Sequence, residues 1–299
     1  MESVHVHRIQ GRDLRESDIA AIRALIAANP TGHRTRLSVE LARAWNWRSA
    51  ASQLQDMAAR SLLLKLERRG WITLPSRRGA HHPRRASRLQ AVLPTAAPIT
   101  EPLAGLLPLR VETLPPGHPE RMIFSRYLSQ HHYLGYRGSV GETLAYLVGD
   151  CLGRDLACVL FGAAAWKTKP RDAWIGWDDD TRARRLSLVA NNHRFLILPW
   201  VQVPHLASHL LGRICRRLPD DWQTQYGHPV HLLETFVERE RFKGTCYRAA
   251  NWTCVGQTRG RSRQDRTRQL RVPIKDIYLY PLSSRCREQL CHVQAPPRA

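Results

Sequence analysis

The sequence predicts an α+β protein with two domains, and three observations lead to this prediction. Apolar residues recur at helical spacing between residues 17 and 75. Prolines then crowd residues 93–119 and forbid a long helix there. Farther along the chain, apolar runs of strand length alternate with helical patterns, which is typical of a mixed sheet covered by helices. We therefore expect an N-terminal domain at 1–92, a Pro-rich, semi-rigid linker at 93–119 and a second domain at 120–299.

The N-terminal domain is predicted to be a winged helix-turn-helix. Ser17 and Ser38 are placed to cap two helices, a third helix ends at Gly70, and residues 71–74 suggest a short strand. In a winged helix, one helix enters the major groove while the basic wing contacts phosphate. The DNA-binding candidates in the wing are Arg77, Arg78, Arg84 and Arg85. A winged helix that binds protein instead of DNA is the alternative.

The second domain is predicted to begin with a helix and a hairpin and to continue with strands and helices in alternation. The expected helices are residues 122–128 and 206–218. The expected strands are residues 143–148, 157–162, 194–199, 230–237 and 274–280. This order predicts a sheet that is antiparallel at its start and mixed thereafter.

Charge points to a nucleic-acid partner. The 299-residue chain has a formal net charge of +21, and 41 of its 46 basic residues are Arg. Arginine suits nucleic acid because its planar fork binds phosphate and guanine edges with two hydrogen bonds. Genomic base composition could explain the preference for Arg over Lys, but it does not explain the net charge. We therefore expect DNA as the partner.

Cysteine usage and hydropathy predict a soluble, cytoplasmic protein. The seven cysteines are odd in number and form no C-x-x-C pair, which indicates buried thiols in a reducing compartment. No apolar run reaches the length of a membrane span, and the start of the chain has no signal-peptide pattern. We expect no membrane partner and no metal site.

Residues 232–252 are the most informative segment. The pattern predicts an apolar strand, a charged loop and a short helix in which small residues surround Tyr247. Small residues let the backbone approach another group closely, and Tyr, Lys and Cys side chains can move protons or bind anions. We predict that Tyr247 faces a cleft between two strands, and the candidate catalytic residues are Tyr247, Lys243, Cys246 and Asn251. A tight packing contact between helix and sheet is the alternative.

Three further residues are catalytic candidates. His132 and Tyr133 belong to the run His131–Tyr133, in which the histidines could bind a metal or act as acid–base groups. Adjacent histidines point in different directions and rarely ligate one ion, and a lone histidine is more often structural. Glu234 lies inside an apolar strand, so its carboxylate must be paired or have a shifted pKa. A structural ion pair is as plausible for Glu234 as catalysis. Its nearby cations in the sequence are Arg239, Arg241 and Lys243.

A basic loop at residues 256–271 follows the candidate site. Such a run is usually solvated, but beside a pocket it would hold a nucleic-acid backbone. Its candidate DNA-binding residues are Arg259, Arg261, Arg263, Arg266 and Arg268.

The order of strands and helices resembles the GNAT acyltransferase fold. In that family a strand runs into a helix whose N-terminal amides hold the pyrophosphate of coenzyme A. The resemblance places this contact at Ala207 and Ser208 and implies a coenzyme A thioester as cofactor, although the family's glycine-rich turn is absent here. It also implies that Tyr247 serves as a general acid.

Several motifs resemble the A protein of Druantia anti-phage systems, whose relatives also occur in mobile elements. They are His132–Gly135, Arg171–Trp177, Asn191–Trp200, Leu206–His209 and Arg241–Trp252. The last of them is also similar to a turn of phage Mom-type DNA-modification proteins, through Gly244, Tyr247, Ala249 and Trp252. This resemblance implies a defence or mobile-element protein that works with other defence proteins.

Three functions are compatible with the sequence. The first is a DNA-binding defence or mobile-element protein with a GNAT-like domain that modifies or processes DNA. The second is a non-catalytic DNA-recognition subunit that recruits defence partners. The third is a transposase or recombinase with Tyr133 or Tyr247 as nucleophile, although no acidic triad suited to two-metal chemistry is evident.

Overall fold

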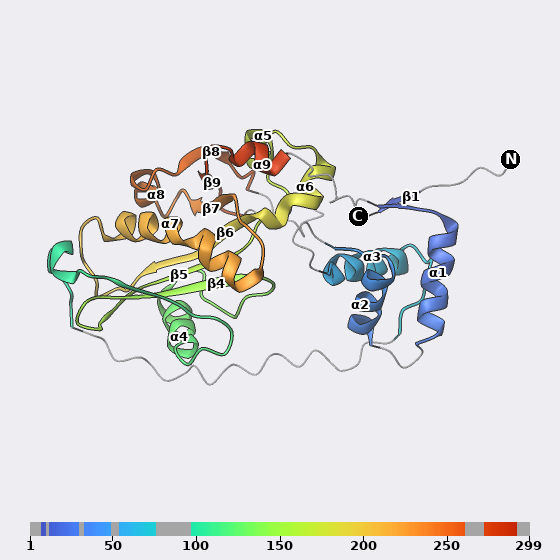
Figure 1. The fold of residues 1–299 in the computed structure, drawn as a ribbon, viewed down its shortest axis with the longest axis horizontal. Coiled ribbons are helices and arrows are strands. Elements are labelled where there is room, and N and C mark those ends of the chain that lie inside the picture. Colours follow the sequence, from blue (N-terminus) through green and yellow to red (C-terminus); the bar gives the residue numbers. More distant parts are fainter. Residues whose placement is uncertain are drawn as a thin grey trace. The chain divides into compact units, whose positions relative to one another are not determined.

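The protein consists of two compact units, Met1–Arg88 and Leu89–Ala299, and each has its own hydrophobic core (Figure 1). The computed structural model describes residues 7–9, 12–29, 33–48, 54–75, 97–260 and 272–291. The boundary between the units falls within a few residues of the predicted end of the first domain at residue 92. We describe each unit by itself.

The first unit is a short hairpin followed by three helices. The hairpin pairs β1 (His7–Ile9) with β2 (Arg12–Leu14), and the helices are α1 (Glu16–Ala27), α2 (Arg34–Ala44) and α3 (Asp56–Arg68). Their apolar stripes meet in one core, in which Ile22, Leu37 and Leu62 are fully buried. The three predicted helices are therefore present, because spacing of apolar residues determines which face of each helix is buried.

The predicted caps of these helices are wrong. At α1, the residue before the helix is Arg15, and its backbone N–H donates to the Asp18 carboxylate at 2.8 Å. At α2, the cap is His33, whose Nδ1 accepts the Arg36 N–H at 3.1 Å. Ser38 lies inside α2, where its hydroxyl donates to the Thr35 carbonyl at 2.8 Å. A serine can satisfy its hydroxyl in this way within a helix, so its presence alone does not mark a start.

The winged form of this unit stays a prediction. Residues 71–74, expected as a strand, follow α3 without strand structure, with Ile72 and Leu74 buried against the helices. The predicted wing residues Arg77, Arg78, Arg84 and Arg85 lie outside the described residues.

The second unit is built on a seven-stranded mixed sheet, which agrees with the predicted α+β class. Its strands are β3 (Arg110–Thr113), β4 (Thr143–Gly149), β5 (Asp155–Ala163), β6 (Val189–Ile197), β7 (Leu232–Glu238), β8 (Thr253–Gln257) and β9 (Lys275–Pro281). The strand order is β3-β4-β5-β6-β7-β9-β8. Every neighbouring pair is antiparallel except β6–β7, which is parallel.

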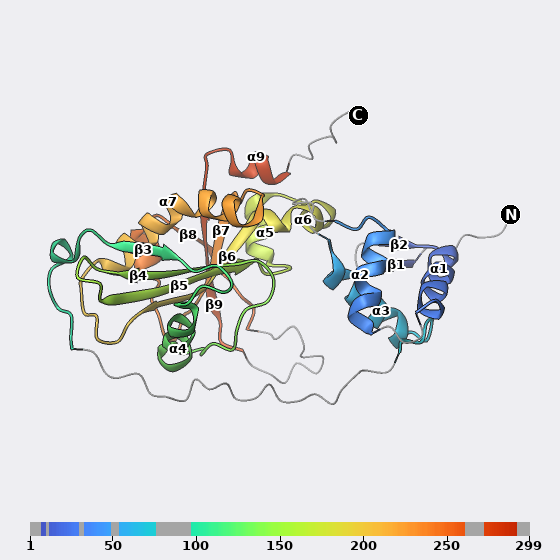
Figure 2. The same ribbon diagram turned by 60° about the horizontal axis from the view of Figure 1, so that its bottom comes forward.

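Helices cover both faces of this sheet, with α7 on one face and α4 on the other (Figures 1 and 2). The described helices are α4 (Arg121–His131), α5 (Lys169–Ile175), α6 (Asp179–Arg185), α7 (Leu206–Tyr226), α8 (Thr245–Ala249) and α9 (Cys286–Cys291), with 3-10 turns η1 (Leu103–Leu106) and η2 (Leu186–Leu188). Helix α7 connects the parallel strands, as a crossover must. Each helix in the described part of the chain is too short or too polar to span a bilayer.

Helix α7 is longer than the sequence predicts, because it continues through Pro219. Proline removes one backbone hydrogen bond and normally ends a helix. Here the later turns are held by tertiary contacts: Trp222 is buried, and the Tyr226 hydroxyl bonds both the N–H and the carbonyl of Thr143, at 2.6 and 2.7 Å. Packing therefore outweighs the local preference for a helix end at Leu218.

The prediction of a linker at 93–119 is wrong for its described part, residues 97–119. This segment contains η1 and the edge strand β3, and Ile99, Leu106, Leu109 and Leu114 are buried in the core of the second unit. Proline density correctly excludes a long helix, but prolines are compatible with an edge strand and with buried turns. The available signal that this segment belongs to the core was its five leucines, at 103, 106, 107, 109 and 114.

The parallel strands β6 and β7 diverge along their length. They pair at Val189–Leu232, Ala190–Leu233 and Asn191–Glu234, after which β6 follows β5 and β7 follows β9. A bulge in β6 accompanies the divergence. Leu160 of β5 pairs with Arg194 and Phe161 with Asn192, so that His193 has no paired residue on β5. The sheet thus opens into a fork whose base is formed by Asn191 and Glu234.

Candidate functional site

A cavity of about 550 Å³ lies in this fork. Its walls come from the diverging halves of β6 and β7, from the end of α4, from the start of α7 and from the segment leading into α8. The lining residues are His131, His132, Tyr133, Leu134, Asn192, His193, Phe195, Leu196, Ile197, Ala207, Thr235, Phe236, Val237, Arg241, Phe242, Lys243, Gly244, Thr245, Cys246 and Tyr247. Segments separated by more than a hundred residues in the sequence therefore meet at one place.

Five of the candidate catalytic residues lie around this cavity. His132 and Tyr133 approach from the α4 side, whereas Lys243, Cys246 and Tyr247 come from the α8 side. The structure thus brings together two groups that the sequence singled out separately. It also places Tyr247 between β6 and β7, where the sequence predicts a cleft.

Tyr247 is buried and firmly oriented. Its hydroxyl donates to Asn192 Oδ1 at 2.7 Å, and its ring packs on Phe195 and Tyr278 with centroids 6.2 and 5.9 Å away. The Asn192 amide is itself fixed, because its Nδ2 donates to the carbonyls of Leu160 and Arg194 at 3.2 and 3.1 Å. Burial raises the pKa of the Tyr247 hydroxyl far above its ordinary value. The phenol is therefore protonated at neutral pH and costly to ionise, so it is not a ready nucleophile; its O–H can still donate a hydrogen bond.

His132 is held as a neutral imidazole. Burial, reinforced by the Arg194 guanidinium, lowers its pKa to about 4. Its Nδ1 accepts the Leu134 N–H at 3.2 Å, so the proton of the neutral ring is on Nε2. The ring stacks on Tyr133 with a centroid distance of 4.9 Å. His132 is thus a hydrogen-bond donor at the cavity wall.

The cavity contains donors and cations but lacks acids. No Asp or Glu is found among its lining residues within the described ranges. Arg241 and Lys243 are exposed at its edge, and Lys243 makes no ion pair with any described side chain. Such a surface favours a negatively charged ligand. It does not suit two-metal hydrolysis, which needs convergent carboxylates.

Two lining residues, Asn192 and His193, were not candidates from the sequence, whereas His131 was considered there together with His132. His131 Nε2 is buried without a hydrogen-bond partner in the described structure, so a polar ligand atom could satisfy it. His193 Nε2 lies 3.0 Å from the Ala163 carbonyl oxygen, and a side chain at Gly162 would collide with its ring. The available signal was polar residues Asn191–His193 inside an otherwise apolar strand.

Gly244 is small for a reason that the sequence analysis did not predict. Its φ is +65°, and a Cβ there would clash with the hydroxyl of Tyr278. That hydroxyl accepts a hydrogen bond from Arg248 Nη1 at 3.0 Å. The missing side chain therefore makes room for Tyr278 as well as opening the cavity wall.

Glu234 belongs to a buried ion-pair network and does not line the cavity. Both Glu234 and Arg171 have fully buried side chains, and Arg171 Nη1 donates to Glu234 Oε2 at 3.0 Å. The Ala165 N–H donates to the other carboxylate oxygen at 2.7 Å. Burial raises the pKa of Glu234, and Arg171 opposes this rise. The partner is thus Arg171 and not the predicted cations of residues 239–243.

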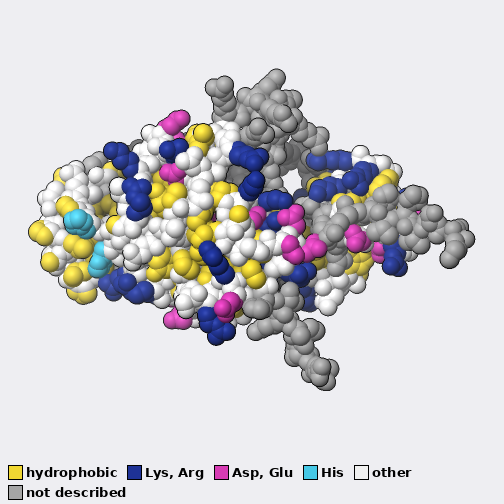
Figure 3. All heavy atoms as spheres, turned by 90° about the horizontal axis from the view of Figure 1, so that it is seen from above, with side chains coloured by type: hydrophobic (Ala, Val, Ile, Leu, Met, Phe, Trp, Pro, Cys, Tyr) yellow, Lys and Arg dark blue, Asp and Glu magenta, His cyan; other side chains and the backbone are white. Residues whose placement is uncertain are grey.

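The remaining candidates are placed as follows. Asn251 ends α8 with a φ of +64° and is exposed outside the cavity. Ala207 lines the cavity, whereas the Ser208 hydroxyl donates to the His205 carbonyl at 3.0 Å. Arg259 is exposed. Arg261, Arg263, Arg266 and Arg268 lie outside the described residues, as do the four wing arginines. On the face shown in Figure 3, Lys and Arg side chains are scattered among uncharged ones.

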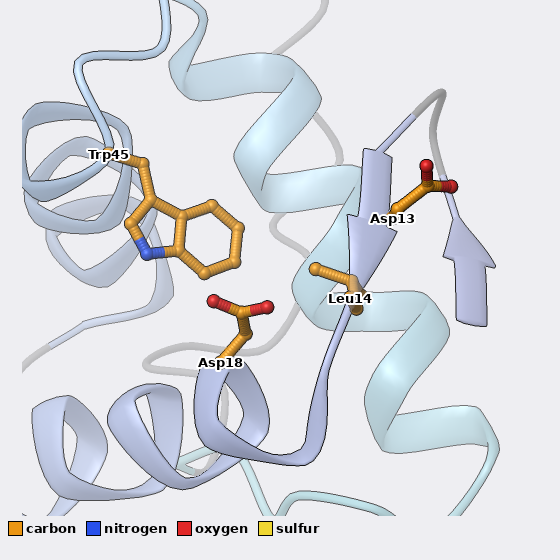
Figure 4. A pocket seen from close by; sticks show the side chains of 4 residues that line it. All are labelled: Asp13, Leu14, Asp18 and Trp45. Carbon is orange, nitrogen blue, oxygen red and sulfur yellow. The ribbon is translucent and has the colours of Figure 1, made fainter. Parts of the chain in front are cut away.

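A second, smaller hollow of about 330 Å³ lies in the first unit, lined by Asp13, Leu14, Asp18 and Trp45. Figure 4 shows the Asp18 carboxylate near the Trp45 ring, with Asp13 pointing away from it. Its two carboxylates make it unsuitable for phosphate.

Glu112, His118 and Glu120 place one potential metal-ligand atom each within 4.8 Å of one another. No metal site is predicted here from the sequence. Ion pairs explain much of the short distance between these side chains, because Glu112 contacts Arg110 at 3.0 Å and His118 at 3.4 Å. We assign no metal ion to this cluster.

Comparison with known proteins identifies the family. No curated protein matches the chain. Among solved structures, spermidine N-acetyltransferase from Vibrio cholerae in complex with CoA and spermine has 12% identity and a TM-score of 0.38, over 58% of this chain and 95% of that one. Microcin C7 self immunity acetyltransferase MccE, in complex with acetyl-CoA and AMP, has 8% identity and a TM-score of 0.30, over 46% and 61%. These weak similarities establish neither cofactor nor substrate. The model of Druantia protein DruA, however, matches residues 65–276, and the chain therefore belongs to the DruA family.

Proposed function

We propose that this chain is a DNA-binding protein of anti-phage defence whose fork cavity modifies or processes DNA. Family membership implies the defence role. The observation that carries the rest is the cavity's composition: donors and cations, without a carboxylate in its described lining, in a chain of net charge +21. DNA is the polyanion that such a protein meets in an infected cell. Other defence-system proteins are expected partners.

Tyr247 is the proposed proton donor. Its hydroxyl carries its proton at neutral pH, and Asn192 holds that hydroxyl in one position. Because burial raises its pKa, the phenol would give up this proton only to a strongly basic leaving group. His132 Nε2–H would stabilise negative charge nearby. A tyrosine recombinase needs the hydroxyl as a nucleophile, which burial disfavours here. We therefore do not propose recombination or transposition.

Coenzyme A, the cofactor implied by the acyltransferase resemblance, fits this site poorly. The connection from β6 to α7 does lead to the cavity, and His205 takes a left-handed conformation at φ +63° before the helix. However, residues 198–205 contain two prolines and the buried side chains of Leu198, Trp200 and Val201 in place of a glycine-rich turn. Such a segment offers few convergent amides for a pyrophosphate. We derive no step through coenzyme A.

The missing glycine turn supports a second candidate, a non-catalytic subunit that recognises DNA and recruits defence partners. In that case the cavity would bind DNA without changing it. The two candidate functions predict different results when the Tyr247 hydroxyl is removed. Phage protection should be lost if the cavity is catalytic and kept if the chain only recruits partners.

We expect DNA binding to depend steeply on salt. Each phosphate contact releases counterions and should add about 0.9 to the slope of log affinity against log salt concentration. Fluorescence anisotropy with a labelled duplex at several salt concentrations measures this slope. A slope near zero would exclude the proposed electrostatic contact with DNA.

Deletion of residues 1–95 should weaken duplex binding and leave the second unit folded. Its core begins at Ile99, whose backbone bonds to Trp200 and Gln202, and includes none of the deleted residues. Thermal unfolding of the fragment checks the fold, and anisotropy checks the affinity. If the fragment binds duplex DNA as tightly as the whole chain, the N-terminal unit contacts a protein.

A further inference from the structure

We propose that the edge of the fork cavity binds a single unpaired nucleotide of a DNA strand, with the base stacked on Phe242 and its phosphates held by Arg241 and Lys243. This inference rests on the proposed action on DNA and adds the form of DNA that the cavity accepts.

Phe242 is a large apolar residue that is exposed at the cavity. The residue is 45% accessible, whereas Tyr247, Leu196 and Val237 in the same lining are buried. An exposed aromatic side chain costs solvation free energy and is common where a ring of a ligand stacks. Phe242 packs against Tyr133 in an edge-to-face arrangement, with ring centroids 5.2 Å apart and an interplanar angle of 63°. This contact gives the ring one aromatic neighbour and leaves much of the residue open to a ligand.

Two cations, Arg241 and Lys243, flank Phe242 in the sequence, and both line the cavity. The Arg241 guanidinium lies 4.9 Å above the Tyr133 ring, and its contact to Glu238 is long, at 3.8 Å. Lys243 has no ion-pair partner among the described residues. Alternating cations and aromatic rings follow the chemistry of a single strand, in which phosphates alternate with bases. A simple anion would use the cations and leave the aromatic ring without a partner.

Arg241, Phe242 and Lys243 lie at the edge of a cavity that is formed by a fork of the sheet. Bases in a duplex are stacked and paired, so their rings cannot reach a side chain within a cavity of this size. An unpaired or extruded nucleotide can bring its base to Phe242 while its own backbone remains outside. The buried Nε2 of His131, which has no partner in the described structure, lies in the same wall and would meet a polar edge of the base.

The test uses the full chain and a short oligothymidine strand. Phe242→Ala should lower its affinity about tenfold, or ~1.4 kcal/mol, because one stacked base is lost. Phe242→Trp should preserve the affinity, and ultraviolet cross-links should map to the peptide around Phe242 in the wild type. Trp166→Ala is the matched control, since Trp166 is 43% exposed and lies outside the cavity lining; it should leave the affinity unchanged. Circular dichroism confirms that each variant is folded.

Three further measurements test the role of charge, the preference for a single strand over a duplex, and the preference for a strand over a free nucleotide. Lys243→Gln should reduce the salt slope for the single strand by about 0.7, an effect that a purely structural residue would not have. Phe242→Ala should change duplex affinity less than twofold, on the order of the error of such assays. In a competition assay, an unlabelled second oligonucleotide should displace the labelled strand fully. ADP at the same concentration should not displace it.

Equal affinity of Phe242→Ala and wild type for the single strand would overturn the inference, as would equal losses in Phe242→Ala and Phe242→Trp. Displacement by ADP as effective as by the oligonucleotide would show that the site takes a free nucleotide instead. These failures are distinguishable from failure of the proposed function, in which the wild-type chain would bind no DNA at all.

Discussion

The Tyr247→Phe variant should fold, bind DNA with wild-type affinity and lose phage protection. The substitution keeps the ring contacts with Phe195 and Tyr278 and removes only the hydroxyl. Loss of its hydrogen bond to Asn192 should cost roughly 1 kcal/mol of stability, which a folded domain tolerates. A positioned proton donor contributes about 100- to 10,000-fold to a reaction rate. The plating efficiency of phage on cells carrying the complete defence system measures the loss.

Tyr278→Phe is the matched control. It removes a hydroxyl from the ring stacked on Tyr247, but Tyr278 is not among the residues that line the cavity, and its hydroxyl bonds Arg248. We expect this variant to protect cells as the wild type does. Full protection by Tyr247→Phe would remove Tyr247 from the chemistry and favour the recruitment subunit.

The segment around Tyr247 could be predicted from the sequence because its signals are local. A strand, a charged turn and a short helix with small residues are each specified by neighbouring residues, and β7, α8 and β8 lie where the pattern indicates. The same holds for the β4–β5 hairpin, whose apolar runs pair as expected.

The convergence of His132 with Tyr247 could not be derived in this way. Their proximity depends on the divergence of β6 from β7 after Asn191 and Glu234, and this divergence has no local pattern. Likewise, the extension of α7 through Pro219 and the burial of Leu106 depend on tertiary packing, which outweighs local propensity. The partner of Glu234 is another example, since Arg171 is 63 residues away in the sequence.

The ion pair of Glu234 leads to the second large effect: Arg171→Met should destabilise the second unit by about 3–5 kcal/mol. The substitution leaves the Glu234 carboxylate fully buried without its cation, and it also removes the hydrogen bonds from Arg171 to Asp172 and to the Ala165 carbonyl. Urea unfolding of the full chain, followed by circular dichroism, measures the loss. Arg184→Met is a control, because Arg184 is an exposed arginine of α6 and should cost little.

The double variant Arg171→Met, Glu234→Leu tests the cause of that loss. If the unpaired buried carboxylate is responsible, removing it as well should recover much of the stability, since apolar replacements of buried ion pairs are often neutral. An equal loss in the single and double variants would assign the effect to the hydrogen bonds with Asp172 and Ala165 instead.

Glu234 forms the last parallel pair with Asn191, and Thr235, the next residue, lines the cavity. The ion pair with Arg171 fixes Glu234 at the point where β6 and β7 begin to diverge. Arg171→Met should therefore also weaken single-strand binding at the cavity edge, even under conditions in which the variant remains folded.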